Sequence, residues 1–338
     1  MIIHFINRGN LMREVIENIV KKYFEGSFSV VIKDGRIIVE LDGVQENIDK
    51  ATALKNELLS LEGIKKVNII FTAVKAASSL HPEESRWSVR NVKKIIAVAS
   101  GKGGVGKSTT AVNLALSFAA LGQKTALFDA DIYGPSLPTM LGFEGQPAVS
   151  LDGKTFEPFD VFGLQVMSIG TLIDRDTPLI WRGSKACGAI EQLLTEVNWR
   201  DIDLMVIDMP PGTGDIQITL SQKLKLDGAI IVSTPQDIAL IDAVKGVNMF
   251  EKVNVPILGI VENMSYYICP KCGNRDDIFG HAGAKETASR LGVRFLGELP
   301  LHYDIRAHSD SGQPIVVSEP DSVYAKAYLD IARKVISD

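Results

Sequence analysis

The feature that most constrains the fold is a glycine-rich segment, GKGGVGKS, at residues 101–108. It follows an apolar run of strand type, KIIAVAS, and precedes a helix-length segment, STTAVNLALSFAALG. The segment fits the pattern G-x-x-x-x-G-K-[ST], whose fixed positions are filled by Gly101, Gly106, Lys107 and Ser108. Glycines let backbone N–H groups curl around phosphate oxygens, and the helix N-terminus adds the positive end of its dipole. The segment therefore predicts a phosphate-binding loop between a strand and a helix.

Two side chains of this loop carry specific chemistry. We expect Lys107 to reach the β- and γ-phosphates of a nucleoside triphosphate, and Ser108 to ligate Mg²⁺. The predicted nucleotide-binding residues are Gly101, Lys102, Gly103, Gly104, Val105, Gly106, Lys107, Ser108 and Thr109. A glycine-rich turn could serve helix–strand packing alone, but the full pattern in this context argues against that. The loop does not distinguish ATP from GTP, and no Asn-Lys-x-Asp guanine motif is evident.

From Lys94 onward, short β-rich apolar runs alternate with helix-length segments. The runs are KIIAVAS, KTALFD, LMVID, GAIIVS and ILGIVE, with a weaker one at VRFLG. This alternation is typical of an α/β fold with a mostly parallel sheet that helices cover on both faces. The sequence therefore predicts a doubly wound P-loop NTPase domain over residues 94–338.

The first 73 residues follow a different pattern. Apolar residues at helical spacing from Leu11 to Val20 predict a helix, and FSVVIKDGRIIVELD predicts a hairpin around Asp34-Gly35. A second helix over Ile48 to Leu61 and a strand at VNIIFTA complete the order αββαβ, a small α+β domain at residues 1–73. Residues 74–93 lose the periodicity and predict a linker, whose basic residues we interpret as a solvated face.

Composition excludes several classes of protein. A net charge of -5 argues against a chain that coats nucleic acid, so no nucleic-acid partner is expected. No run of about 18 uncharged apolar residues is present, so no membrane partner is expected either. Three cysteines in 338 residues do not resemble a disulfide framework, which favours a reducing compartment and a cytoplasmic location.

Acidic residues follow two of the predicted strands. FDADIYGPS places Asp129 and Asp131 after one strand, and MVIDMPPGTGD places Asp208 after another. Ligands of open parallel sheets bind beyond the carboxyl ends of the strands, where a carboxylate holds Mg²⁺ or orients the attacking water. Helix capping is the alternative role for these carboxylates. The loop at residues 210–215 is interpreted as a sensor of the γ-phosphate or, alternatively, as a rigid turn.

A cysteine pair lies in YYICPKCGN, where Cys269 and Cys272 are separated by two residues. Two thiolates at this spacing can bind one metal, but two ligands do not close a tetrahedral site. Since Cys187 is distant in sequence and is interpreted as a small buried residue, two copies of the pair in a homodimer would supply four thiolates. Such a site is compatible with zinc or with a [4Fe–4S] cluster, and a redox disulfide is a third reading.

The order of motifs along the chain resembles that of one family. GKGGVGKST is followed by FDADIYGPSLP, WRG, DIDLMVIDMPPGTGD, VSTPQDIAL, VENMSYYICPKCG and IFGHAGAKETA. Over residues 92–336 this series resembles the Mrp/ApbC (Nbp-type) P-loop ATPases, which are iron–sulfur cluster carriers. The lysine after the first glycine, Lys102, resembles that of the deviant Walker A loop in the MinD, ParA and nitrogenase-iron-protein superfamily.

The resemblance implies roles for single residues. Lys102 would reach across a nucleotide-sandwich homodimer to the partner's nucleotide, so Lys102, Lys107 and Asp131 form the expected catalytic set. Asp131 would act on the attacking water, whereas Asp129, with Asp208 and Ser108, would belong to the Mg²⁺ shell. Asn263 and Pro300 match positions that flank the base, although ordinary loop roles are the alternative for both.

The resemblance also implies an activity. It implies slow ATP hydrolysis coupled to the delivery of a labile [4Fe–4S] cluster to apo iron–sulfur proteins. The cluster would be bridged at a homodimer interface by Cys269 and Cys272 of both chains. The N-terminal region resembles a short assembly domain of the same family, but it contains no cysteine, so direct metal binding by it is not expected.

Two other functions stay open at this stage. A spatial-organisation ATPase of the MinD or ParA kind would need a membrane-binding C-terminal helix or a basic DNA-binding surface. The tail SVYAKAYLDIARKVISD has few basic residues and predicts a packing helix instead. A dimeric ATPase whose cysteines hold structural zinc is the other alternative.

Overall fold

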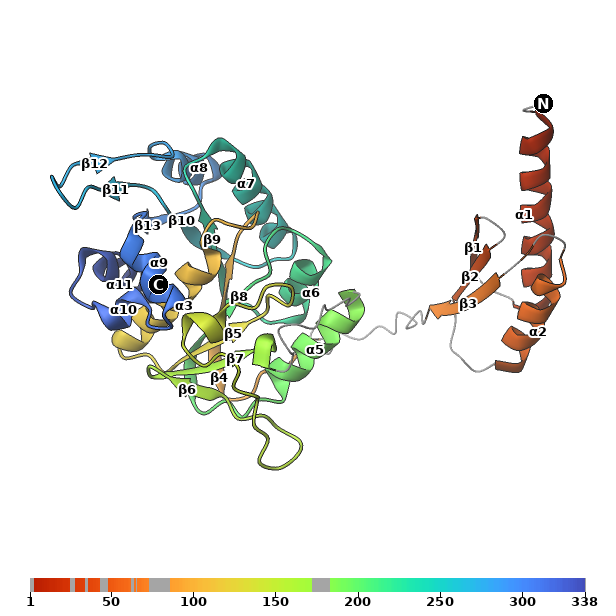
Figure 1. Cartoon of the computed structure of the whole chain (residues 1–338), viewed down its shortest axis with the longest axis horizontal. Helices are drawn as coiled ribbons and strands as arrows, with labels where there is room; N and C mark the ends of the chain where they lie inside the picture. The colour runs from red at the N-terminus through yellow and green to blue at the C-terminus, as the bar shows by residue number, and fades with distance from the viewer. Residues whose placement is uncertain are drawn as a thin grey trace. The chain divides into compact units, whose positions relative to one another are not determined.

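The computed structural model describes residues 3–24, 28–33, 36–42, 48–61, 64, 66–72, 86–171 and 183–337. The chain divides into two compact units, Met1–Glu84 and Ser85–Asp338 (Figure 1). Among the described residues, no helix is both long and apolar enough to cross a membrane.

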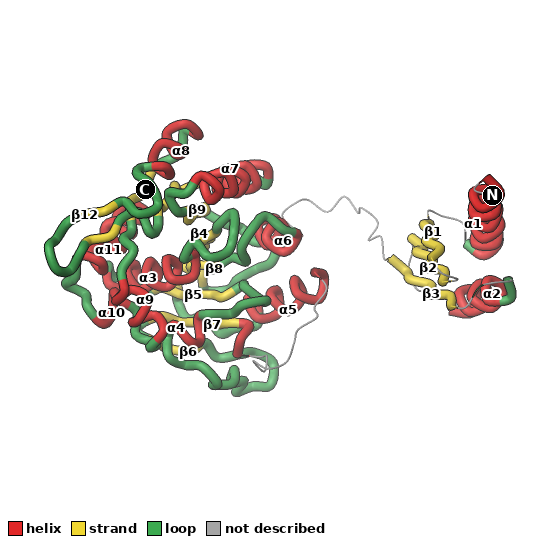
Figure 2. The backbone as a smooth tube through the Cα atoms, turned by 45° about the horizontal axis from the view of Figure 1, so that its top comes forward, coloured by secondary structure: helices red, strands yellow, loops and turns green. Residues whose placement is uncertain are grey.

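The smaller unit is an α+β domain with the predicted element order. Its elements are α1 (Ile3–Tyr23), β1 (Phe28–Lys33), β2 (Arg36–Asp42), α2 (Ile48–Leu59) and β3 (Lys66–Thr72). β1 pairs antiparallel with β2, and β2 pairs parallel with β3. The two helices pack on one face of this sheet around a core that includes Ile16, Val39 and Leu58 (Figure 2). The predicted turn at Asp34-Gly35 lies outside the described residues.

Charged side chains join the two helices of this unit at its surface. Lys22 of α1 lies 3.0 Å from the carboxylate of Glu57 on α2.

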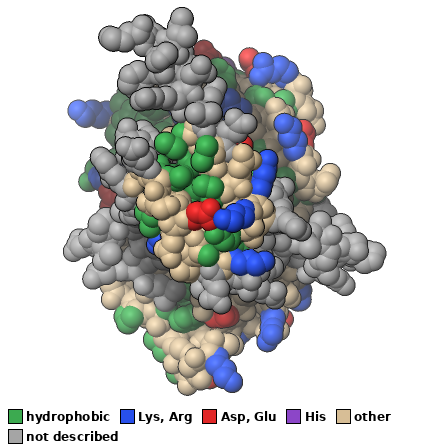
Figure 3. Space-filling model, turned by 90° about the vertical axis from the view of Figure 1, so that its right-hand side faces the viewer, with side chains coloured by type: hydrophobic (Ala, Val, Ile, Leu, Met, Phe, Trp, Pro, Cys, Tyr) green, Lys and Arg blue, Asp and Glu red, His purple; other side chains and the backbone are tan. Residues whose placement is uncertain are grey.

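Helix α1 begins at Ile3, well before the predicted start at Leu11. In the view of Figure 3, Lys and Arg side chains are interspersed with Asp and Glu among apolar ones.

The larger unit has an eight-stranded sheet in the order β13-β10-β9-β4-β8-β5-β7-β6. Every neighbouring pair is parallel except β6 with β7. The strands are β4 (Val92–Ala99), β5 (Thr125–Asp129), β6 (Phe159–Val161), β7 (Leu164–Ser168), β8 (Ile202–Asp208), β9 (Gly228–Ser233), β10 (Ile257–Glu262) and β13 (Phe295–Glu298). This arrangement confirms the predicted doubly wound, mostly parallel α/β fold.

Helices cover both faces of this sheet, and a separate apolar cluster fills each face (Figure 2). One face carries α5 (Gly183–Thr195), α6 (Asp215–Lys223), α7 (Asp237–Lys252) and α8 (Gly283–Leu291). The other carries α3 (Lys107–Ala120), α4 (Leu137–Met140), α9 (Tyr303–Asp310), α10 (Ile315–Ser318) and α11 (Val323–Ile336). A short 3-10 helix (Ile169–Thr171) follows β7. A small hairpin, β11 (Tyr267–Ile268) with β12 (Arg275–Asp276), projects beside β13 (Figure 1).

The structure corrects three expectations. The backbone N–H of Trp87 donates to the Lys223 carbonyl at 2.8 Å, and Trp87 and Val89 pack on the core, so residues 86–93 of the predicted linker belong to the larger unit. The edge strands β6 and β7 were not predicted, because their apolar runs are short and broken by glycine. Cys187 is half-buried in α5 and not fully buried as expected.

The C-terminal helix α11 packs inside the larger unit, as its sequence predicts. Ala325, Tyr328 and Ile331 are buried against α3 and β13, because the apolar positions recur at helical spacing on one face.

Candidate functional site

The phosphate loop joins β4 to α3, and two close approaches fix its path. A Cβ at Gly101 would overlap the Asp242 carbonyl of α7, and a Cβ at Gly106 would overlap the side-chain amide of Asn263. Gly106 has a φ of 79°, in the left-handed region that favours glycine. Gly103 and Gly104 are exposed; a Cβ at Gly104 would meet nothing within 4 Å, and one at Gly103 would meet only the Pro211 Cβ at 4.0 Å. The loop can therefore present backbone N–H groups to a phosphate at the start of α3.

Lys107, the first residue of α3, forms a buried ion pair with Asp208 at the end of β8. Only 6% of Lys107 and none of Asp208 is exposed. The Lys107 ammonium also lies 3.1 Å from the hydroxyl of Ser108. The second carboxylate oxygen of Asp208, Oδ2, is buried and has no hydrogen-bond partner among the described residues.

Asp129 ends β5 and is the register partner of Asp208 in the neighbouring strand. Its Oδ1 accepts the backbone N–H of Asp131 at 3.0 Å, and its Oδ2 accepts the hydroxyl of Ser168 at 2.9 Å and the N–H of Leu137 at 3.3 Å. Burial, followed by the charge of Asp208, raises the pKa of Asp129 to about 7.

These residues fit a bound Mg²⁺ ion. The orphaned Asp208 Oδ2, the Asp129 carboxyl group and the Ser108 hydroxyl offer the hard oxygen donors that this ion prefers. An orphaned buried carboxylate oxygen is costly unless a cation or a water satisfies it. Because the pKa of Asp129 is near 7, binding of the ion near neutral pH would release a proton from this group.

Asp131 lies beside this pair and is half-buried. Burial raises the pKa of its carboxyl group, whereas the charge of Lys107 opposes that rise. A partly desolvated carboxylate with a raised pKa is a better proton acceptor than an ordinary aspartate. Its place next to the buried pair suits the role that the sequence predicts, an action on the attacking water.

Asn263 and Pro300 are both buried, and they follow the ends of two paired strands, β10 and β13. Asn263 follows β10 directly and donates from Nδ2 to the Val105 carbonyl at 2.8 Å. Pro300 follows Leu299, whose N–H donates to the Glu262 carbonyl at 2.8 Å. Asn263 thus contacts the phosphate loop itself, while its predicted place beside a base stays a prediction.

Lys102 lies in the loop and is half-exposed. Its carbonyl accepts the Ser100 hydroxyl at 2.8 Å, which fixes the backbone at this position. Within the described part of the chain, no carboxylate pairs with its ammonium group. The side chain is therefore available to a ligand or to a second copy of the chain.

The two cysteines lie at the tip of the β11–β12 hairpin, away from the buried carboxylates. The Cys269 N–H donates to the Asn274 carbonyl at 2.9 Å, and the Gly273 N–H donates to the Cys269 carbonyl at 2.8 Å. Cys269 is half-buried and Cys272 is exposed, and both are free thiols. Backbone N–H groups of Cys272 and Lys271 lower the pKa of the Cys269 thiol, which favours the metal-binding thiolate.

No third metal ligand joins the cysteines: among the described residues, no group of three or more His, Cys, Asp or Glu side chains could hold a metal ion. One chain therefore offers two free thiols on this hairpin, two fewer than a four-thiolate site needs. The structure thus separates the predicted site residues into two groups: those around the phosphate loop and the buried carboxylates, and the cysteine pair on the hairpin.

Two further residues near the site, Ser168 and Glu262, were not identified from the sequence. Ser168, at the end of β7, holds Asp129, and its only signal was the short run LQVMS. Glu262 is fully buried, accepts the Ser265 hydroxyl at 2.6 Å and accepts the Ala284 N–H at the start of α8 at 2.6 Å. The sequence signal for Glu262 was an acidic residue at the end of the apolar run ILGIVE.

The chain is similar to known proteins over most of its length. The ParA family model, described as NUBPL iron-transfer P-loop NTPase, matches residues 91–336. A protein of Escherichia coli K12 named iron-sulfur cluster carrier protein is 50% identical over 279 residues, which cover 82% of this chain and 75% of the relative. The mouse protein named iron-sulfur cluster transfer protein NUBPL is 52% identical over 250 residues, 73% of this chain and 78% of the relative.

Solved structures agree on the fold. The nucleotide-binding protein of Archaeoglobus fulgidus in complex with ADP is 37% identical with a TM-score of 0.61, over 72% of this chain and 93% of that one. The cell division ATPase MinD of Pyrococcus furiosus is 25% identical with a TM-score of 0.56, over 72% of this chain and 98% of that one.

Proposed function

Because the chain belongs to the family of NUBPL-type iron-transfer P-loop NTPases, we propose that it is an ATP-hydrolysing iron–sulfur cluster carrier. Its cargo would be a labile [4Fe–4S] cluster, held between two copies of the chain and passed to apo-proteins. The observation that carries the proposal is the pair of free thiols on an accessible hairpin of the same unit as the phosphate loop. The names of the relatives support the same cargo.

In the nucleotide centre, each residue has a task set by its position. Backbone N–H groups of residues 103–108 and the Lys107 ammonium would bind the β- and γ-phosphates. Asp208, Asp129 and Ser108 would hold Mg²⁺, which neutralises charge on these phosphates when bound. Asp131 would orient the attacking water and hold its proton. The ADP bound by the Archaeoglobus fulgidus protein supports an adenine nucleotide.

At the cysteine hairpin, one chain offers two thiolates and a second copy would complete the set. Four thiolates satisfy the iron atoms of a [4Fe–4S] cluster. Exposure of Cys272 and the lowered pKa of the Cys269 thiol favour exchange of the cargo with a recipient protein. Lys102 would reach the nucleotide of the second copy, so closure of the dimer would depend on bound ATP.

Anaerobic reconstitution with iron and sulfide tests this function. The visible spectrum should show broad sulfur-to-iron charge-transfer absorbance, which Cys269→Ala and Cys272→Ala should abolish. Cys187→Ala is the matched control and should retain the absorbance, because Cys187 lies on α5. A colourless protein that binds zinc after the same treatment would favour the structural-zinc alternative.

A further inference from the structure

The backbone peptide between Val105 and Gly106 faces two partners at once. Its N–H belongs to the run of donors that a phosphate would bind, and its carbonyl accepts Nδ2 of Asn263 at 2.8 Å. A peptide is planar, so its N–H and C=O turn together. Any rotation that aims this N–H at a phosphate must therefore shift or break the hydrogen bond to Asn263.

The Asn263 amide has little room to follow such a rotation without moving its own backbone. Asn263 is 6% exposed, and a Cβ at Gly106 would overlap its amide nitrogen. The backbone N–H of Asn263 donates to the Ser233 carbonyl at 2.7 Å. A close-packed side chain transmits a displacement to its neighbours because no void absorbs it.

A short, tightly bonded segment joins Asn263 to the cysteines. The Ser265 hydroxyl donates to the buried Glu262 carboxylate at 2.6 Å, and the Ser265 N–H donates to the Leu299 carbonyl at 2.9 Å. The Tyr266 carbonyl then accepts the Leu301 N–H at 2.7 Å. The next residue, Tyr267, begins β11, and Cys269 follows the end of that strand.

The base of the hairpin is also held firmly. Arg275 of β12 stacks over the ring of Tyr266, with 4.2 Å between the guanidinium carbon and the ring centroid. The same guanidinium donates to Glu298, the last residue of β13, at 2.9 Å. A shift at residues 263–266 would therefore reach the base of the hairpin through bonded neighbours, with no unbonded loop between them.

We propose that Asn263 is a positioning residue that couples the nucleotide state of the phosphate loop to the geometry and accessibility of Cys269 and Cys272. The inference rests on the proposed function for its purpose: occupancy by nucleotide would set how tightly the thiolates hold the cargo. The route of this coupling runs from Val105 through Asn263 and Ser265 to the hairpin.

The test measures alkylation of each cysteine by iodoacetamide, resolved by mass spectrometry, in reduced, metal-free full-length protein. Rates are compared without nucleotide, with saturating MgADP and with a saturating non-hydrolysable ATP analogue, whose affinities are measured separately. In the unmodified protein, nucleotide should change the rates at Cys269 and Cys272 by about fivefold or more, a typical size for coupling between two sites. In Asn263→Ala at saturating nucleotide, this ratio should fall to about one.

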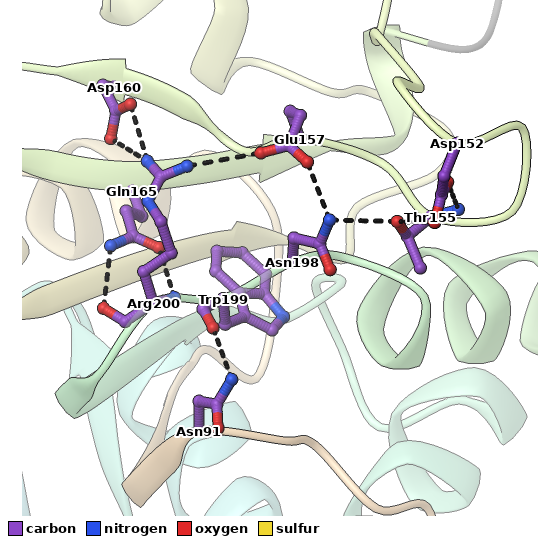
Figure 4. A network of polar contacts seen from close by, with 9 residues as sticks. All are labelled: Asn91, Asp152, Thr155, Glu157, Asp160, Gln165, Asn198, Trp199 and Arg200. Carbon is purple, nitrogen blue, oxygen red and sulfur yellow. Dashed lines mark hydrogen bonds and ion pairs between the residues drawn. The ribbon is translucent and has the colours of Figure 1, made fainter.

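Asn198→Ala is the matched control. The Asn198 amide donates to Thr155 and Glu157 at 3.0 and 2.7 Å within a polar network at the β6 side of the sheet (Figure 4). The control loses an amide of the same kind remote from the phosphate loop, and it should keep the nucleotide effect of the unmodified protein. Ser265→Ala should reduce the nucleotide-dependent change in alkylation rate, although Ser265 does not contact the phosphate loop. If Asn263→Ala cannot bind nucleotide, the result for Ser265→Ala tests the route instead.

The outcomes separate this inference from the proposed function. Nucleotide binding with no change in alkylation in the unmodified protein would overturn the coupling and leave the carrier function standing. A full nucleotide effect in both Asn263→Ala and Ser265→Ala would overturn the route. Failure of the unmodified protein to bind any nucleotide would instead contradict the proposed function itself.

Discussion

Asp129 and Asp208 are register partners at the carboxyl ends of two adjacent parallel strands, and both side chains are completely buried. Their environments differ. Asp208 pairs with Lys107, whereas Asp129 is held by hydroxyl and backbone donors, and burial together with the charge of Asp208 raises its pKa to about 7. Two carboxylates next to one another in the interior repel each other unless a proton or a cation lies between them.

This relationship predicts a pH dependence of stability in metal-free protein. The folded state raises the Asp129 pKa from 3.8 to about 7, so it keeps a proton that the unfolded chain releases. The free energy of unfolding should therefore fall as pH rises across that interval and should level off above it. Asp129→Asn should flatten this slope. The slope is measured by urea unfolding at a series of pH values, with tryptophan fluorescence as the signal. This signal reports on the larger unit, because Trp87, Trp181 and Trp199 all belong to it.

The measurement must be made with a chelator present, since a bound divalent cation would replace the proton. Asp160→Asn is a suitable control, because Asp160 pairs with Arg200 at the surface. An Asp129→Asn slope equal to that of the unmodified protein would contradict the account of this site.

Lys107→Ala should abolish nucleotide binding and also destabilise the protein. Removing one partner of a buried ion pair leaves the other charge uncompensated, which costs about 3–5 kcal/mol. The double variant Lys107→Ala/Asp208→Asn should recover part of that stability but not nucleotide binding. Isothermal titration with ATP, alongside urea unfolding, checks both effects, and ATP binding by either variant would disprove the assigned role of Lys107.

Gly106→Ala and Gly104→Ala form a matched pair in the phosphate loop. Both glycines have φ near +80°, so alanine costs about 1–2 kcal/mol of backbone strain at either position. Only at Gly106 would the new methyl displace the Asn263 amide from Val105. Gly106→Ala should therefore be the more destabilising by about 1–3 kcal/mol, the cost of an orphaned buried polar group. Equal unfolding midpoints without nucleotide would count against the contact.

Lys102→Ala should leave nucleotide affinity of the single chain nearly unchanged and should prevent ATP-dependent dimerisation. The Lys102 ammonium has no carboxylate partner among the described residues, so its loss costs the fold little. Sedimentation velocity with a non-hydrolysable ATP analogue measures the dimer. Lys154→Ala is the control, because Lys154 is exposed and, among the described residues, only its backbone N–H bonds within the chain, to Asp152. Dimerisation of Lys102→Ala at the level of the unmodified protein would refute the cross-subunit role.

Local patterns predicted most of the fold and which residues lie together around the phosphate loop. The glycine loop, the strand-terminal aspartates and the cysteine spacing each lie within a short stretch of consecutive residues. Parallel strands then bring their carboxyl ends, and the residues after them, to one edge of the sheet. Contacts between distant segments were not predictable in this way. The hydrogen bond from Asn263 to Val105, and that from Ser168 to Asp129, depend on which strands become neighbours.

The start of the larger unit was missed for a similar reason. Residues 86–91 have no periodicity, yet Trp87 and Val89 pack on its core, since tertiary contacts override local composition. The unpredicted strand β7 is five residues long and lies beside β5, where it supplies Ser168 to the site.

The most direct test of the carrier function is the iron content and mass of the reconstituted protein, measured together. We expect a dimer that holds about four iron atoms for its two chains, as one [4Fe–4S] cluster on four thiolates requires. Cys269→Ala and Cys272→Ala should be free of iron, and Cys187→Ala should match the unmodified protein. A monomer that retains the cluster, or a dimer that retains it without Cys269 and Cys272, would contradict the account.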